Sequence, residues 1–338
     1  MDPGPASQRM GFKMGLFDLL NKKNASVLSF IEEGTRFHES GQFADAVDSF
    51  EKALSQDPGR YDAWVGRGSA LFYLDRYSDA LTSFEKAIEI DPRRPDAWKN
   101  RGRTLHELGR PSEAIESYEK AIDCDPGDAD TLHYRGLALH ELGRLADAVE
   151  AYEQILKTDQ NNPDIWFRHG VALDDLGQYV RSIESYNRAL AIDPSNAVGW
   201  YNRGVALRHL GRYEEAVASY DHALSLAPDD PGTWYNRGVA LRNLGRYEDA
   251  IESYDRALAL DPDDADTWHN RGVALRKLGR NADAVSSFDQ ALSINSTDAA
   301  IWYNRGIALR QLGRYENCLL YTSPSPRDRT RSRMPSSA

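Results

Sequence analysis

Asparagine recurs in this chain of 338 residues at multiples of 34 residues. The series consists of Asn100, Asn202, Asn236, Asn270 and Asn304. An amide side chain has hydrogen-bond donors and an acceptor, so a row of amides can hold the backbone of an extended peptide without reading its sequence. The alternative is that each asparagine tolerates a half-exposed site and recurs through duplication.

Tyrosine and arginine follow the same spacing. Tyrosine directly precedes three of the asparagines, and arginine follows four of them by six positions: Tyr201, Tyr235, Tyr303, Arg208, Arg242, Arg276 and Arg310. Guanidinium forks and tyrosine hydroxyls bind carboxylates well, so we expect a site for an acidic peptide. The alternative is that an arginine late in a helix only offsets the helix dipole.

No other pattern predicts chemistry. The eight histidines form no HExxH motif, and Cys124 and Cys318 are too few for a metal cluster or a disulfide framework. No nucleophile with a base and no phosphate loop is recognisable. We therefore expect no enzymatic activity, no metal, no cofactor and no small-molecule substrate, and we expect Cys124 to be a small core residue.

The tryptophans share this period. They are Trp64, Trp98, Trp166, Trp200, Trp234, Trp268 and Trp302, all separated by 34 residues or twice 34. Leu132 fills the gap in the series, and Phe30 extends it toward the N-terminus. The chain thus contains nine repeats, which begin at residues 27, 61, 95, 129, 163, 197, 231, 265 and 299.

Each repeat, with positions numbered 1 to 34, predicts two amphipathic helices. Apolar residues follow the helical period of about 3.6. Glycine at position 8, as in Gly204, Gly238 and Gly272, allows two helices to approach, while aromatic residues at positions 4 and 24 fill the space around them. Glycine at position 15 predicts the end of the first helix. An N-cap at position 34 predicts the start of the next repeat, as at Asp128, Asn162, Asn196, Asp230 and Asp264.

These units resemble the tetratricopeptide repeat. The segment TWYNRGVALRNLGRYEDAIESYDRALALDPDD, residues 233–264, matches the family's W, G, Y, A, Y/F, A, P pattern, and the match runs from about 27 to 317. The resemblance implies an all-α, right-handed superhelical solenoid of antiparallel helix pairs. It also implies that positions 2, 5, 6, 9, 12 and 13 line a concave groove, where some similar arrays use asparagine ladders to hold peptides.

The resemblance also offers a comparison with chaperone-binding relatives. Their carboxylate clamp requires lysine, asparagine and arginine at set positions. The nearest residues here are Lys99, Arg103, Tyr134, Asp164 and Arg168, which do not match. Recognition of chaperone tails is therefore not expected.

Position 7 is arginine in most repeats, where the family usually has an apolar residue. Position 25 of the same repeat is acidic wherever position 7 is arginine and the second helix is complete. In repeat five both change together, to His169 and Asn187. We therefore predict a structural ion pair within each repeat. Repeat one, with Glu33 and Glu51, does not follow this rule.

The two ends differ from the array. Residues 1–26 read as a leader, with Met14 as a plausible true start. Residues 318–338, beginning CLLYTSPSPRD, interrupt the ninth repeat and resemble translated sequencing-adapter DNA, so we expect them to be a disordered artefact. We accordingly expect the gene to be truncated, with further repeats or another domain downstream, because a solenoid needs a capping helix.

Charge and hydropathy limit the partners. The net charge of -11 argues against nucleic acid, and no apolar run is long enough for a membrane helix. No secretory signal is recognisable, so a cytoplasmic location is expected. The leading hypothesis is a non-catalytic scaffold that binds a peptide or extended protein segment in the concave groove. The alternative is a regulatory or substrate-binding part of a larger enzyme, such as a transferase, kinase or protease.

Overall fold

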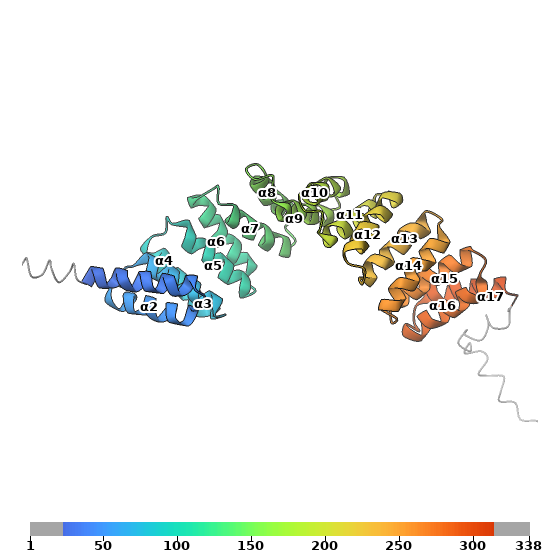
Figure 1. The fold of residues 1–338 in the computed structure, drawn as a ribbon, viewed down its shortest axis with the longest axis horizontal. Coiled ribbons are helices and arrows are strands. Elements are labelled where there is room, and N and C mark those ends of the chain that lie inside the picture. Colours follow the sequence, from blue (N-terminus) through green and yellow to red (C-terminus); the bar gives the residue numbers. More distant parts are fainter. Residues whose placement is uncertain (1–22, 314–338) are drawn as a thin grey trace, which may run out of the picture. The chain divides into compact units, whose positions relative to one another are not determined.

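The computed structural model describes residues 23–313, and in that range the chain is helical with short turns and contains no strand. It divides into two compact parts, Met1–Leu176 and Gly177–Ala338. The leader up to residue 22 and the segment from 314 onward, including the expected adapter sequence, lie outside the described residues. Figure 1 labels the helices of both parts.

The N-terminal part contains a helix over residues 23–39 and eight further helices. These are α2 (Phe43–Gln56), α3 (Tyr61–Tyr73), α4 (Tyr77–Ile90), α5 (Pro95–Glu107), α6 (Pro111–Cys124), α7 (Ala129–Glu141), α8 (Leu145–Leu156) and α9 (Pro163–Asp175). From α3 onward, odd-numbered helices are the first helices of the repeats and even-numbered helices are the second.

The C-terminal part begins with the second helix of repeat five. Its helices are α10 (Tyr179–Ile192), α11 (Ala197–His209), α12 (Tyr213–Leu226), α13 (Pro231–Asn243), α14 (Tyr247–Leu260), α15 (Ala265–Lys277), α16 (Asn281–Ile294) and α17 (Ala299–Gln311). The predicted pair of helices is confirmed in repeats one to eight, and in repeat nine the described residues include the first helix, α17.

Within each part every helix packs against the helix before it and the helix after it. First helices of successive repeats also contact one another: α3 with α5, α5 with α7, α11 with α13, α13 with α15, and α15 with α17. Residues that recur on first helices therefore lie on one continuous surface over α3, α5 and α7, and on another over α11, α13, α15 and α17.

The ends of the helices follow the predicted capping residues. The glycines at position 15, such as Gly211 and Gly245, adopt φ of 74° and 76°, a left-handed conformation that suits a residue without Cβ. All five predicted N-caps accept a hydrogen bond from a backbone N–H of the first helical turn. These local signals are enough to separate one helix from the next.

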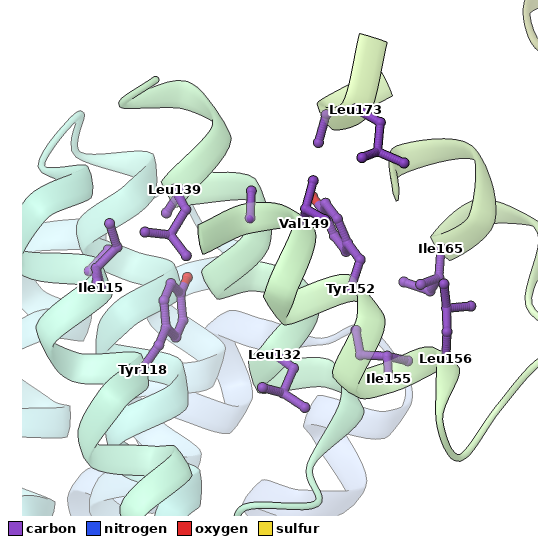
Figure 2. Packing of buried hydrophobic residues seen from close by; sticks show 14 of the residues in the cluster. Ile115, Tyr118, Leu132, Leu139, Val149, Tyr152, Ile155, Leu156, Ile165 and Leu173 are labelled. Carbon is purple, nitrogen blue, oxygen red and sulfur yellow. The ribbon is translucent and has the colours of Figure 1, made fainter. Parts of the chain in front are cut away.

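The glycines at position 8 lie against the aromatic ring at position 24 of the same repeat. A Cβ placed on Gly238 would lie 2.6 Å from Cε1 of Tyr254, and one on Gly204 would lie 2.6 Å from Cε1 of Tyr220. Because no real Cβ comes this close, glycine is what allows the ring to pack flat against the first helix. The equivalent tyrosines of the N-terminal part, Tyr118 and Tyr152, are also fully buried and belong to one apolar cluster (Figure 2).

Cys124 is exposed, so its assignment to the core is wrong. It is the last residue of α6, and the equivalent residues Ile90, Ile192, Leu226, Leu260 and Ile294 are also exposed, by 40 to 45%. The last residue of the second helix therefore faces solvent rather than the core. Between residues 23 and 313 no helix has the length and apolar character needed to cross a membrane.

Candidate ligand-binding surface

Most of the sequence-predicted binding residues lie on the first helices of the C-terminal part. We call this set the Tyr–Asn–Arg stripe. It consists of Tyr201, Asn202 and Arg208 on α11, Tyr235, Asn236 and Arg242 on α13, Asn270 and Arg276 on α15, and Tyr303, Asn304 and Arg310 on α17. Because neighbouring first helices touch, the stripe is continuous across them.

Asn270 shows how one repeat is connected to the next in the stripe. Its Nδ2 donates to the hydroxyl of Tyr235 at 3.1 Å and to the backbone carbonyl of Asp266 at 2.9 Å. Its Oδ1 accepts a hydrogen bond from Arg242. Tyrosine and arginine of one repeat therefore hold the asparagine of the following repeat, and both of its N–H donors are engaged within the protein.

The neighbouring asparagines repeat this arrangement. Asn236 donates to the Tyr201 hydroxyl at 3.2 Å, and Asn304 donates to Nε2 of His269 at 3.1 Å. Asn304 also accepts from Arg276 at 3.4 Å. His269 thus takes the place of tyrosine on α15. His269 was not among the predicted site residues because it is not a tyrosine, although it occupies position 5 of its repeat as Tyr201 and Tyr235 do.

The stripe retains donors that can bind a ligand. Burial, with a smaller contribution from Asp266 and Asp264, raises the pKa of Tyr235, and burial likewise raises that of Tyr201. Both hydroxyls therefore keep their proton at neutral pH. Arg208, Arg242 and Arg276 are each partly exposed, although Nε of Arg208 and Nε of Arg276 are buried. Protonated hydroxyls and guanidinium N–H groups are suitable donors for carboxylate and carbonyl oxygens.

The ends of the stripe are less connected. Asn202 is half-buried, and the preceding position 5 is Phe167, which has no group that could accept a hydrogen bond. Tyr303 is 70% exposed and Arg310 is exposed. The complete Tyr–Asn–Arg arrangement is therefore found where Tyr235 and Arg242 of α13 meet Asn270 of α15.

Asn100 is on α5 of the N-terminal part and is not counted in the stripe. It lines a cavity of about 110 Å³ together with His38, Phe72, Tyr73 and Arg103. The guanidinium of Arg103 lies 5.0 Å from the centre of the Phe72 ring and 4.9 Å from that of Tyr134. Within the N-terminal part, the surroundings of Asn100 are thus aromatic rings and an arginine.

The N-terminal part uses its charged residues differently. Lys99 pairs with Asp128 at 3.0 Å, and Arg168 pairs with Asp164 at 2.8 Å. At position 12, His106 and His140 contact carboxylates of the following repeat at 2.7 and 2.8 Å. The nearest counterparts of a carboxylate clamp are thus engaged with acidic neighbours or aromatic rings.

The arginines at position 7 do form ion pairs, but the predicted pairing within a repeat is wrong. Nε of Arg237 donates to Asp221 of the preceding repeat at 2.7 Å, and Nη1 donates to Ser253 of its own repeat at 2.6 Å. Arg67, Arg271 and Arg305 pair with the preceding repeat in the same way. The guanidinium also lies over the ring of the tryptophan at position 4, 5.7 Å away for Arg237 and Trp234. This arginine therefore joins two repeats.

Comparison with known families agrees with the repeated helix pairs of the structure. Families described as tetratricopeptide repeat match residues 31–95, 67–129, 135–197, 197–230, 117–150 and 219–252, and a family described as TPR repeat matches 240–279 and 274–313. Together these matches span residues 31–313. The chain belongs to the tetratricopeptide repeat family, as the sequence pattern predicted. No curated protein sequence matches it.

Solved structures share the fold at low sequence identity. The C-terminal part of a TPR repeat-containing protein from Cytophaga hutchinsonii is 16% identical with a TM-score of 0.56, over 81% of this chain and 98% of that one. A tetratricopeptide repeat protein from Parabacteroides merdae is 18% identical with a TM-score of 0.52, over 74% and 99%. YrrB, described as a TPR protein with an unusual peptide-binding site, is 23% identical with a TM-score of 0.51, over 55% and 96%.

Proposed function

We propose that this protein is a non-catalytic interaction scaffold whose Tyr–Asn–Arg stripe binds an extended, acidic segment of another protein. An array of tetratricopeptide repeats supports the general role, since stacked helix pairs present long surfaces rather than enclosed catalytic sites. Residues 23–313 contain no cluster of three or more residues suited to holding a metal ion.

The observation that carries the proposal is the repeated bonding of asparagine to residues of the preceding repeat. Because the amide donors of Asn236 and Asn270 are already engaged, the asparagines act by positioning their neighbours. The tyrosine hydroxyls and arginine side chains then supply the donors that meet the ligand. The ligand's carboxylates pair with the arginines, and its backbone carbonyls accept from the hydroxyls.

The spacing of the stripe indicates an extended ligand. Equivalent donors recur once per repeat along successive first helices, so a ligand must reach several helices to contact more than one set. An extended segment does this with few residues. Multiple weak contacts of this kind give affinity without requiring a deep pocket.

A peptide-array screen with the full chain tests this proposal. We expect the bound peptides to be enriched in Asp and Glu, and we expect binding to be lost when Asn202, Asn236 and Asn270 are all changed to Ala while the helical content is retained. The matched control changes three exposed, uncharged residues of second helices, Ser225, Ser286 and Gln290, to Ala. Unchanged binding by the asparagine variant, or the absence of any bound peptide, would contradict the proposal.

A further inference from the structure

Seven repeats carry a tryptophan at position 4, and in all seven the indole binds in the same way. Its Nε1 donates to the backbone carbonyl six residues earlier, at 2.8 to 3.0 Å. For Trp98 and Trp200 that carbonyl belongs to Pro92 and Pro194. The loop between repeats therefore provides a standard acceptor for an indole N–H.

Two other groups define this indole site. The guanidinium at position 7 lies over the ring, 5.6 Å from its centre for Arg203 and Trp200 and 6.0 Å for Arg67 and Trp64. The side chain at position 26 lies beside the ring, since the rings of Trp200 and His222 stack at 4.4 Å. All seven indoles thus share the carbonyl, five of them lie under a guanidinium, and Trp200 also stacks on a residue of the second helix.

Repeat four has the site without the indole. Leu132 takes the tryptophan position, and a cavity of about 480 Å³ lies beside it, lined by Leu132, Pro126, Gln154, Ile155 and neighbouring residues. Pro126 and Gln154 occupy the repeat positions of Pro194 and His222. Figure 2 shows Leu132 on α7 and Ile155 on α8, the two side chains of the buried cluster that line this cavity.

The polar groups of this site are not matched by the protein itself. Leu132 has no N–H to donate to the Pro126 carbonyl. Nε of Arg135 is buried without a hydrogen-bond partner, and its nearest acidic contact, Glu119, lies 3.8 Å from Nη2. Ala151 replaces the serine that accepts from this arginine in other repeats, such as Ser253 for Arg237. The rim is accessible, since Pro126, Gly127, Lys157 and Thr158 are exposed.

We propose that this cavity binds an indole ring, presented as a tryptophan side chain by a partner polypeptide. The indole N–H donates to the Pro126 carbonyl, and the guanidinium of Arg135 lies over the ring face, as the arginine does in five of the repeats that carry tryptophan. The ring contacts the apolar side chains of Leu132 and Ile155. The site belongs to the N-terminal part and is separate from the Tyr–Asn–Arg stripe, so it goes beyond the function proposed above.

The test is an NMR titration of the full chain with N-acetyl-tryptophanamide. We expect saturable shifts of backbone amides in residues 122–132 and 154–158, and at least about tenfold weaker binding of N-acetyl-leucinamide, which corresponds to about 1.4 kcal/mol. Shifts confined to other regions, or no saturation, would overturn the proposal. Saturable binding of free indole without binding of N-acetyl-tryptophanamide would also overturn it, because a polypeptide could not then present the ring.

Variants connect the binding to this cavity. Leu132→Trp places an indole in the site and is expected to abolish binding. Arg135→Leu is expected to weaken binding several-fold, whereas Arg237→Leu, which removes the equivalent arginine over an occupied site, is expected to leave it unchanged. Trp98→Leu is expected to create a second site of the same kind and raise the stoichiometry. Unchanged binding in both Leu132→Trp and Arg135→Leu would overturn the proposal.

Discussion

Arg237 contacts three side chains that come from two repeats. Its guanidinium binds Asp221 and Ser253 and lies over the ring of Trp234. Its side chain is only 19% exposed, whereas that of Asp221 is 52% exposed. A pair with one exposed partner is screened by water, so its direct contribution to stability is modest, on the order of 0.2–1 kcal/mol.

We predict energetic coupling of Arg237 with the preceding repeat. In double-mutant cycles measured by urea unfolding, Arg237→Ala and Asp221→Ala should be coupled by about 0.5–1 kcal/mol. The control cycle uses Asp255→Ala, the acidic residue of the same repeat, which binds Arg271 instead. Coupling with Asp255 in place of Asp221 would show that the pair lies within one repeat.

The sequence alone could not decide between these two partners. Position 25 is acidic in almost every repeat, so the arginine at position 7 has an acidic candidate partner both in the preceding repeat and in its own. The informative exception was repeat one, where Glu51 is acidic although Glu33 replaces the arginine. The structure explains it, because Glu51 binds Arg67 of the next repeat. The paired change of His169 and Asn187 is likewise shared between neighbours, since Asn187 binds Arg203.

We also predict a pH effect at His269. Burial, opposed by Asp298 and Asp266 and assisted by Arg242, lowers the pKa of His269 below its ordinary value of 6.5. A lowered pKa means that the folded state favours the neutral ring, whose Nε2 accepts from Asn304. Its contribution to stability is therefore complete above about pH 6.5 and is lost as pH falls through the folded-state pKa.

The measurement compares the wild type with His269→Tyr, which places at this position the residue found at 201 and 235. Between pH 7 and pH 5 the free energy of unfolding should fall more steeply for the wild type, because only the wild type contains His269. The other histidines are common to both proteins and do not contribute to the difference. Equal pH dependence of the two proteins would show that His269 does not contribute.

At the scale of the helices, a glycine in seven of the first helices sets the contact with the second helix. Tyr254 occupies the space that a side chain at position 238 would need. The sequence predicted that glycine at position 8 allows the two helices to approach and that aromatic residues at positions 4 and 24 fill the space around them, and the contact of Gly238 with Tyr254 agrees with this. It also predicted the helix ends, since the caps are local. It did not predict the exposure of Cys124, which depends on where the last turn of α6 lies relative to its neighbours.

Two glycines of α13 make this testable. Gly238→Ala should lower the free energy of unfolding by about 1–3 kcal/mol, because the new methyl group meets the Tyr254 ring. Gly232→Ala is the matched control: its Cβ would lie 3.6 Å from the Asp230 carboxylate, an ordinary contact. Since alanine favours the helix, stability should rise by up to about 1 kcal/mol. Thermal unfolding of both variants measures the difference, and equal effects would contradict this view of the packing.

At the scale of the molecule, the chain is acidic but its C-terminal part presents a line of arginines. The net charge is -11, so an acidic ligand is repelled by the protein as a whole and attracted only locally. This arrangement favours specificity, because binding requires contact with the stripe. The repeat period predicted which residues share a surface. It could not predict that Asn236, Asn270 and Asn304 are held by the preceding repeat, because that depends on how far one first helix is displaced from the next.

The most direct test of the stripe is the affinity of the tightest-binding acidic peptide from the array for two charge-matched variants. One carries Arg242→Gln and Arg276→Gln in the stripe. The other carries Arg246→Gln and Arg280→Gln, which lose the same charge but lie at the starts of second helices, paired with Asp249 and Asp283. We predict that the stripe variant binds at least about tenfold more weakly, by about 1.4 kcal/mol, and that the other stays within about twofold of the wild type. Equal affinities for the two variants would contradict recognition of acidic segments by the stripe.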